Sequence, residues 1–262
     1  MTLTPWLAAL IAIFLWWFFT GAILCRVRIA DRIGGDAHLW SVILTMPFAL
    51  IGVWGIQDRA SDPSAMGAGL AFFAALMVWG WIELAFLSGV VTGPYKGPAL
   101  DKPSAWRRFL AAWGTLAYHE ILLLAALTLL TYVSLGAANP FGLWTFAVLF
   151  FARISAKLNL YFGVPRINTD FLPQPLAHLK THFRQGSPSL FWPISAMVLT
   201  GVSALWLLRL GEATTPGAQT GYTLLAVLTL LALLEHLFMV VPLPDDKLWR
   251  WMLPAPKPET KN

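Results

Sequence analysis

The sequence contains little charge and only one cysteine. Of its 262 residues 12% are charged, against about 25% in a typical soluble domain, and 58% are hydrophobic, with a mean hydropathy of +0.66. This composition excludes an ordinary soluble globular domain and indicates a polytopic membrane protein. The lone Cys25 excludes a disulfide within the chain.

The N-terminus lacks the basic residues of a secretory signal peptide. Met1 to Pro5 contains no Lys or Arg, the following apolar stretch is long, and no small-residue cleavage site follows it. We therefore expect a retained first helix. The basic balance, with a net charge of +5, does not indicate nucleic-acid binding, because Lys and Arg gathered on one side of a membrane raise the pI without forming a DNA-binding face.

Seven apolar windows are long enough to cross the hydrocarbon layer, which needs about 20 residues of helix. They lie at residues 5–25, 38–57, 67–91, 109–133, 140–162, 190–210 and 221–241. The predicted fold is therefore all-α, with seven transmembrane helices in one domain over residues 1–253. The Pro-rich tail at 254–262 is expected to be disordered and cytoplasmic.

The basic residues predict the orientation of the chain. Fourteen of the 18 Lys and Arg follow the first, third, fifth and seventh windows, whereas Arg59 and Arg209 lie on the opposite side. By the positive-inside rule the N-terminus is periplasmic and the C-terminus is cytoplasmic. The expected location is a bacterial cytoplasmic membrane, crossed several times, with the lipid bilayer as a partner. The oligomeric state is not predicted.

Ionisable side chains inside the predicted spans are the most informative feature. Each acid or base at the bilayer centre costs about 2.5 to 3.5 kcal/mol on the insertion scale, so such groups usually face the bundle interior or a partner. A rise of about 1.5 Å per residue places them about 9 to 16 Å from the cytoplasmic ends of their spans, with His119 and Glu120 deepest. The predicted polar cluster comprises Glu83, His119, Glu120, Arg153, Lys157, Asn159, Glu235 and His236.

Several interpretations of this cluster compete. The residues can form an ion-pair network that fixes helix packing, with Arg153 and Lys157, which are i and i+4 on one helix face, paired to acids. Alternatively, His119 and His236 are candidate ligands of a tetrapyrrole or haem. A metal ion held by Glu and His is a further alternative, although adjacent Glu and His lack the ferritin-like spacing. A proton or ion path through the carboxylates is the last.

The longest cytoplasmic connection, 163–189, contains apolar residues at helical spacing with basic residues between them. Pro173 and Pro175 suit a helix start, and a basic amphipathic helix beside a membrane normally lies in the interface. This segment can alternatively dock a partner. The candidate docking residues are Leu176, Leu179, Lys180, Phe183 and Arg184.

Three regions of the sequence also carry a family resemblance. They are Ala152-Arg-Ile-Ser-Ala-Lys-Leu-Asn159, then Gly163-Val-Pro165 with Asn168-Thr-Asp-Phe-Leu-Pro173, and finally Glu235-His-Leu-Phe-Met239 with Pro242-Leu-Pro-Asp-Asp246. With these segments the chain resembles the PuhE family of photosynthetic complex assembly proteins from purple phototrophic bacteria. The resemblance extends over the whole length and hydropathy pattern, and it transfers no catalytic residue.

The resemblance implies a membrane assembly factor for the photosynthetic reaction centre and light-harvesting complex, acting with subunits of that complex and coordinated with bacteriochlorophyll supply. It does not imply a mechanism. Two alternatives stay open from the residues themselves: a membrane enzyme of pigment metabolism that binds a tetrapyrrole or a metal, and a transporter of a small ion or metabolite.

Overall fold

The computed structural model describes residues 4–169 and 172–242, which form helices and their connections without a named β-strand. The all-α prediction is confirmed for this part of the chain. The predicted disordered tail at 254–262 lies outside the described residues. In chain order the helices are α1 (Pro5–Ile33), α2 (Ala37–Asp58), α3 (Ala65–Leu87), α4 (Ala105–Gly114), α5 (Ala117–Val133), α6 (Phe141–Phe162), the 3₁₀ helix η1 (Gln174–His182), α7 (Phe191–Glu212) and α8 (Pro216–Phe238).

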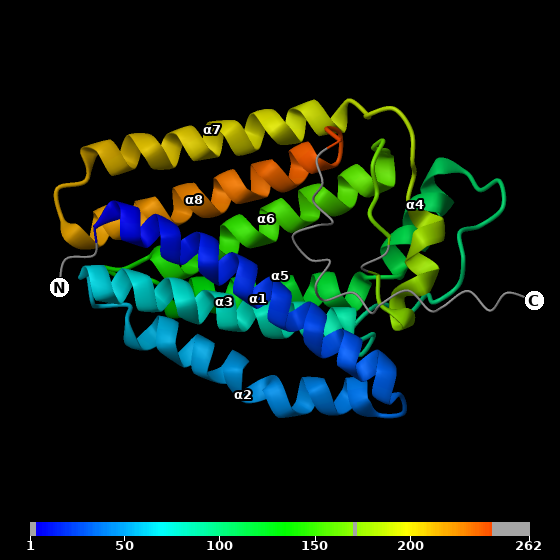
Figure 1. The fold of residues 1–262 in the computed structure, drawn as a ribbon, viewed down its shortest axis with the longest axis horizontal. Helices are drawn as coiled ribbons and strands as arrows, with labels where there is room; N and C mark the ends of the chain where they lie inside the picture. The colour runs from blue at the N-terminus through cyan, green and yellow to red at the C-terminus, as the bar shows by residue number, and fades with distance from the viewer. Residues whose placement is uncertain (1–3, 170–171, 243–262) are drawn as a thin grey trace, which may run out of the picture.

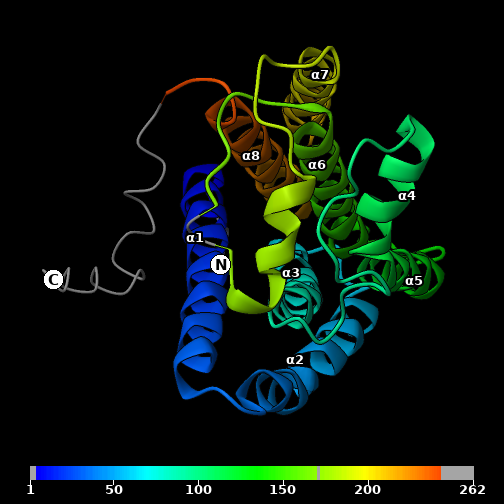
Figure 2. The ribbon, with the colours of Figure 1, turned by 90° about the vertical axis from the view of Figure 1, so that its right-hand side faces the viewer.

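Successive long helices run in alternating directions (Figure 1). Helices α1, α3, α6 and α8 finish at the same end of the bundle, and α4 and η1 lie across that end (Figures 1 and 2). We call it the basic end, because Arg32, Lys96, Lys102, Arg166 and Lys180 all belong to its helix ends and loops. The charge asymmetry of the sequence thus corresponds to an asymmetry of the fold.

Helix α3 occupies the centre of the bundle and packs against α1, α2, α5, α6 and α8. It is apolar on every side and rich in Ala and Gly, which is the pattern of a helix that is buried all round and that lets neighbouring backbones approach closely. In contrast, α1, α2 and α7 bury only a small share of their residues, as expected of helices that face lipid tails. The bundle is therefore built around α3.

The fourth predicted span, 109–133, is not one continuous helix. Within the described residues, six helices are each long and apolar enough to cross a membrane, and a seventh pass is formed if α4 and α5, which meet at an angle of 68°, together make one span. Of these two helices, α4 lies across the basic end, whereas α5 runs along the bundle beside the other long helices (Figure 1). Six predicted spans are confirmed as single helices with shifted ends, and the fourth is corrected to a broken one.

The loop between α3 and α4 supplies the backbone partners that make this break tolerable. The Tyr95 N–H donates to the Gly114 carbonyl at 3.0 Å, and the His119 N–H donates to the Thr92 carbonyl at 3.0 Å. A broken helix near a bilayer requires such replacements, because unpaired backbone groups cannot be left in an apolar medium. Gly114 and Thr115, which are poor helix formers, mark the position of the break in the sequence. The apolar window runs through them without interruption, so hydropathy alone predicts one continuous helix.

The break also corrects the depth predicted for two cluster residues. His119 and Glu120 lie in the first turn of α5, and not about 16 Å along a continuous fourth helix. Their side chains therefore meet the ends of α3 and α6 close to the basic end. The remaining predicted cluster residues lie on α3, α6 and α8, near the same ends.

The close contact between α2 and α3 generates a stability prediction. A Cβ atom on Gly52 would lie 2.7 Å from the Ala74 carbonyl oxygen and 2.7 Å from the Val78 Cγ2. Gly52→Ala should therefore lower the free energy of unfolding by about 1 to 3 kcal/mol through overpacking, measured by thermal or denaturant unfolding in a mild detergent.

Gly201 on α7 provides the matched control, since a Cβ atom there would meet nothing within 4 Å. Gly201→Ala should leave stability unchanged or raise it by up to about 1 kcal/mol, because alanine is the better helix former. Equal destabilisation by both substitutions would contradict the α2 to α3 packing.

The number of passes and their orientation are tested together by labelling. On a Cys25→Ser background, Lys102→Cys and Thr214→Cys place single thiols in the α3 to α4 and α7 to α8 connections. The positive-inside rule and the broken fourth span together predict that an impermeant maleimide labels Thr214→Cys from the periplasm and Lys102→Cys only from the cytoplasm. Labelling of both from one side would show that α5 does not complete a pass.

Candidate functional site

Helix α6 carries two polar faces that point in opposite directions. Arg153 and Lys157 are four residues apart and share one face, and Ser155 and Asn159, also four apart, share another. At about 100° per residue, Ser155 lies about 160° from both Arg153 and Lys157 around the helix axis. The polar residues of the sequence therefore separate into two groups, one on each side of α6.

The first ion pair joins α6 to the central helix α3. An Arg153 Nη2–H donates to Glu83 Oε2 at 2.8 Å, and the Glu83 side chain is buried. The fully buried His119 lies beside this pair, with Nε2 3.7 Å from Glu83 Oε1. That separation is too long for a hydrogen bond, and both ring nitrogens of His119 are without a hydrogen-bond partner.

The second ion pair joins α6 to α5. Lys157 Nζ donates to Glu120 Oε1 at 2.6 Å, and the ammonium lies 5.3 Å from the centroid of the Phe86 ring. The same ring packs against the His119 imidazole, with 4.3 Å between the centroids. Both bases of α6 are thus matched by an acid that a neighbouring helix places beside them.

The third acid of the cluster has a different partner. Glu235 on α8 accepts a hydrogen bond from the Trp16 indole N–H on α1, at 3.1 Å. Trp16 was missed by the sequence analysis, although an indole N–H in the middle of an apolar helix needs an acceptor and is a signal in itself. The cluster of charged residues therefore reaches α1 as well as α3, α5, α6 and α8.

The other face of α6 forms a neutral hydrogen-bonded group. His236 Nδ1 lies 2.8 Å from the Ala232 carbonyl, so this nitrogen donates, and Nε2 lies 2.9 Å from Ser155 Oγ. Asn159 Nδ2 donates to Ser195 Oγ at 3.0 Å and thereby links α6 to α7. Asn159 and His236 were grouped with the charged residues in the sequence, but the structure places them on the opposite side of α6.

This separation bears on the cofactor hypothesis. His119 and His236 lie on opposite sides of α6, and both ring nitrogens of His236 are already engaged within the protein. Within residues 4–169 and 172–242, no group of three or more His, Cys, Asp or Glu side chains is arranged to hold a metal ion. The geometry gives no support to a tetrapyrrole or metal held by the two histidines together.

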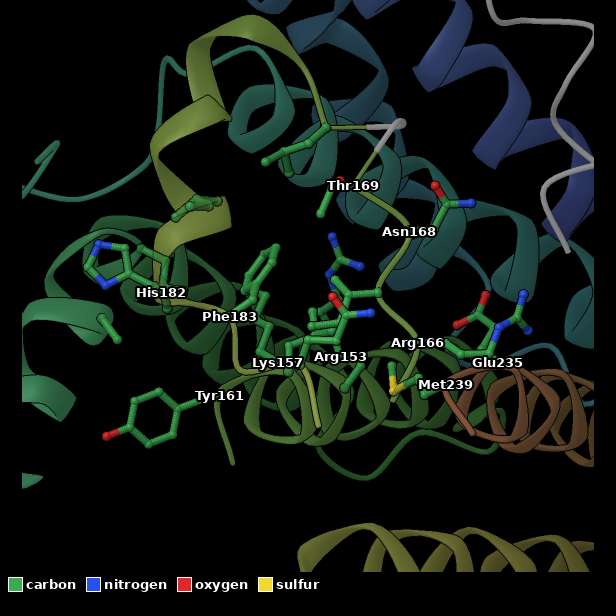
Figure 3. A pocket seen from close by; sticks show the side chains of 18 of the residues that line it. Arg153, Lys157, Tyr161, Arg166, Asn168, Thr169, His182, Phe183, Glu235 and Met239 are labelled. Carbon is green, nitrogen blue, oxygen red and sulfur yellow. The ribbon is translucent and has the colours of Figure 1, made fainter. Parts of the chain in front are cut away.

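A cavity of about 770 Å³ lies beside the charged face of α6 at the basic end (Figure 3). Three basic side chains line it, namely Arg153, Lys157 and Arg166, together with Glu235. Arg166, which the sequence analysis did not select, also donates to the Phe238 and Val241 carbonyls at 3.3 Å and 2.6 Å, and so ties the loop after α6 to the end of α8.

A family model described as a protein of unknown function, DUF3623, matches residues 2–260. The chain belongs to the DUF3623 family. A Rhodobacter capsulatus protein described as an uncharacterized 30.4 kDa protein in the puhA 5' region is 54% identical over 251 residues, which cover 96% of this chain and 92% of that protein. No solved structure matches the chain.

Helix η1 closes part of the cavity of this DUF3623 protein. Leu176 and Leu179 are buried against Phe86 at the end of α3, and Phe183 is half-buried at the cavity wall. The segment at 163–189 was expected to be an amphipathic helix whose apolar face meets a membrane or a partner. Instead, it contains a short 3₁₀ helix whose apolar face turns into the bundle, and only Lys180 and Arg184 of the candidate docking residues are exposed.

Hydrogen bonds attach η1 to the loop between α3 and α4. The Ala99 N–H donates to Thr181 Oγ1 at 2.8 Å, and His182 Nε2 lies 3.2 Å from the Gly97 carbonyl. Outside the spans, burial lowers the pKa of His178 below its ordinary value, and His182 and Lys96 add to the effect through charge repulsion. The cover of the cavity is thus held by hydrogen bonds and apolar packing.

The Glu83 and Arg153 pair generates the prediction for this site. Arg153→Leu leaves Glu83 buried without its cation, so the free energy of unfolding should fall by about 3 kcal/mol. Glu83→Leu combined with Arg153→Leu should recover most of this loss, because an apolar pair of similar volume is often as stable as a buried ion pair. Unfolding of each purified variant in the same detergent measures both effects.

The exposed pair on α7 serves as the control. Arg209 Nη1 lies 3.3 Å from Glu212 Oε2, and both side chains are largely exposed. Arg209→Leu should change stability by less than about 1 kcal/mol. If Arg153→Leu behaved like Arg209→Leu, the pair with Glu83 would have no structural role.

Proposed function

We propose that this DUF3623 protein is an assembly factor for the photosynthetic reaction centre and light-harvesting complex, embedded in the bacterial cytoplasmic membrane. Two findings support the proposal. The name of the Rhodobacter capsulatus relative refers to the puhA 5' region, which points to a photosynthesis-related role. In addition, three regions of the sequence resemble the PuhE family of photosynthetic complex assembly proteins.

The observation that carries the proposal is where these three regions lie. The first two are neighbours in the sequence and the third lies far along the chain, yet each contributes to the wall of the same cavity: Lys157 from Ala152–Asn159, Pro165 and Asn168 from the following loop, and Glu235 from the end of α8. A resemblance that reflected membrane insertion alone would have no reason to concentrate there. We therefore take the cavity and its cover as the functional part of the molecule.

A binding role fits this part better than catalysis. Each carboxylate of the charged cluster already has a partner: Glu83 has Arg153, Glu120 has Lys157 and Glu235 has Trp16. A general acid or base must lie within hydrogen-bond reach of the group that it serves, and neither Glu83 nor Glu120 lines the cavity. In our proposal the exposed Lys180 and Arg184, above the cavity, face subunits of the complex or the surface of the bilayer.

A deletion strain tests the proposed function. Membranes without the protein should lose reaction-centre and antenna absorption bands while pigment precursors stay at their normal level, and the wild-type gene should restore the bands. Accumulation of a precursor would instead favour the enzyme alternative. Unchanged bands with normal growth under phototrophic conditions would contradict the assembly role.

A matched pair of substitutions assigns the effect to the cavity. Ala156 lines the cavity, whereas Ala204 on α7 is exposed among lipid-facing residues. Ala156→Trp, which fills the cavity, should fail to restore the bands at a normal protein level, and Ala204→Trp should restore them.

A further inference from the structure

The two bases of α6 use only part of their hydrogen-bonding capacity. A guanidinium has five N–H donors and an ammonium has three. Arg153 makes one hydrogen bond, to Glu83, although its side chain keeps 36% exposure where it lines the cavity. Lys157 likewise makes one hydrogen bond, to Glu120. Donors from both residues are therefore left for a group inside the cavity.

The charges that line the cavity are mostly positive. Arg153, Lys157 and Arg166 contribute to its wall, and Glu235 is the only carboxylate among the described lining residues. Glu83 and Glu120 neutralise two of these bases but do not line the cavity themselves. A ligand inside would therefore meet the N–H donors directly and the two carboxylates only at a greater distance, where their effect is weaker.

The rest of the wall is mainly apolar, with Asn168, Thr169, His182 and Gln185 among its polar members. Phe86, Leu160, Leu172, Leu179, Phe183 and Phe238 line the cavity. A small hydrophilic anion would leave this apolar surface in contact with water. A purely apolar chain would leave the guanidinium and ammonium donors without acceptors, which is costly in a site that is partly closed.

The position of the cavity also suits a ligand that combines an anionic group with an apolar chain. It lies where α3, α6 and α8 end, which would place it near the headgroup level of a bilayer that these helices span. Its volume of about 770 Å³ falls within the range of about 300 to 1,000 Å³ that is usual for ligand sites.

We propose that this cavity binds one amphiphile whose phosphate headgroup carries a net negative charge, with the phosphate at Arg153 and Lys157 and the apolar chain against Phe86, Leu179 and Phe183. Phosphate oxygens accept charge-assisted hydrogen bonds from guanidinium and ammonium groups, which are stronger than bonds between neutral groups. The ligand class includes membrane lipids and phosphorylated isoprenoids, which share this headgroup chemistry. The inference does not depend on the proposed assembly role, because the purified protein reports it directly.

The test is a titration of the delipidated full-length protein, followed by native mass spectrometry. Dioctanoyl phosphatidic acid should bind as one molecule per chain. Dioctanoyl phosphatidylcholine, with its cationic choline group, and inorganic phosphate, without an apolar chain, should each bind at least about tenfold more weakly. Equal binding of phosphatidylcholine would overturn recognition of the anion, and equal binding of inorganic phosphate would overturn the role of the apolar wall.

Paired substitutions remove the donors without leaving a buried charge. Glu83→Gln with Arg153→Gln, and Glu120→Gln with Lys157→Gln, should each weaken binding of phosphatidic acid about tenfold or more. Arg107→Gln, which removes an exposed cation from α4 outside the cavity, is the control and should have no effect. Wild-type binding by the two paired variants, or an equal loss in Arg107→Gln, would overturn the proposal.

Crosslinking of the wild-type protein covers the case in which a paired variant does not fold. A phosphatidic acid with a diazirine in its chain should mark the peptide that contains Leu160 or the one that contains Phe183. Marks confined to the lipid-facing surfaces of α2 and α7 would overturn the proposal.

Discussion

The bundle depends on matching the two bases of α6 with acids from other helices. Neither base can stay unpaired in an apolar medium, and α6 has no acid of its own within reach. Glu83 reaches Arg153 from α3 and Glu120 reaches Lys157 from α5, so the two ion pairs tie three helices together at one end. The order of these helices follows from where the acids are.

Much of the architecture could be predicted from the sequence because it rests on hydropathy and charge. The long apolar windows gave the helices, and the alternating basic loops match the basic end of the bundle. The break between α4 and α5 could not be predicted in this way. It depends on hydrogen bonds between the loop after α3 and the backbone groups of Gly114 and His119, and hydropathy contains no information on such contacts.

The candidate site was predictable in its members but not in its arrangement. A sequence shows that Arg153 and Lys157 share a helix face, and it shows that Asn159 does not share the face of Lys157. It does not show which neighbour covers each face, so His236 was assigned to the charged group when its partner is Ser155. For the same reason Trp16 and Arg166, which come from α1 and a loop, were not selected.

The position of the two ion pairs beside the cavity is not explained by stability alone. A fully enclosed ion pair can usually be replaced by apolar residues without loss of stability, so stability alone gives little reason for placing two bases here. The two bases have a functional reason for their position if they also line a cavity that binds a ligand. Arg153 and Lys157 meet this condition, because each is held by an acid on one side and borders the cavity on the other. The acids fix the position and charge of the bases, and the remaining donors are thereby oriented before any ligand arrives, which reduces the entropy lost on binding.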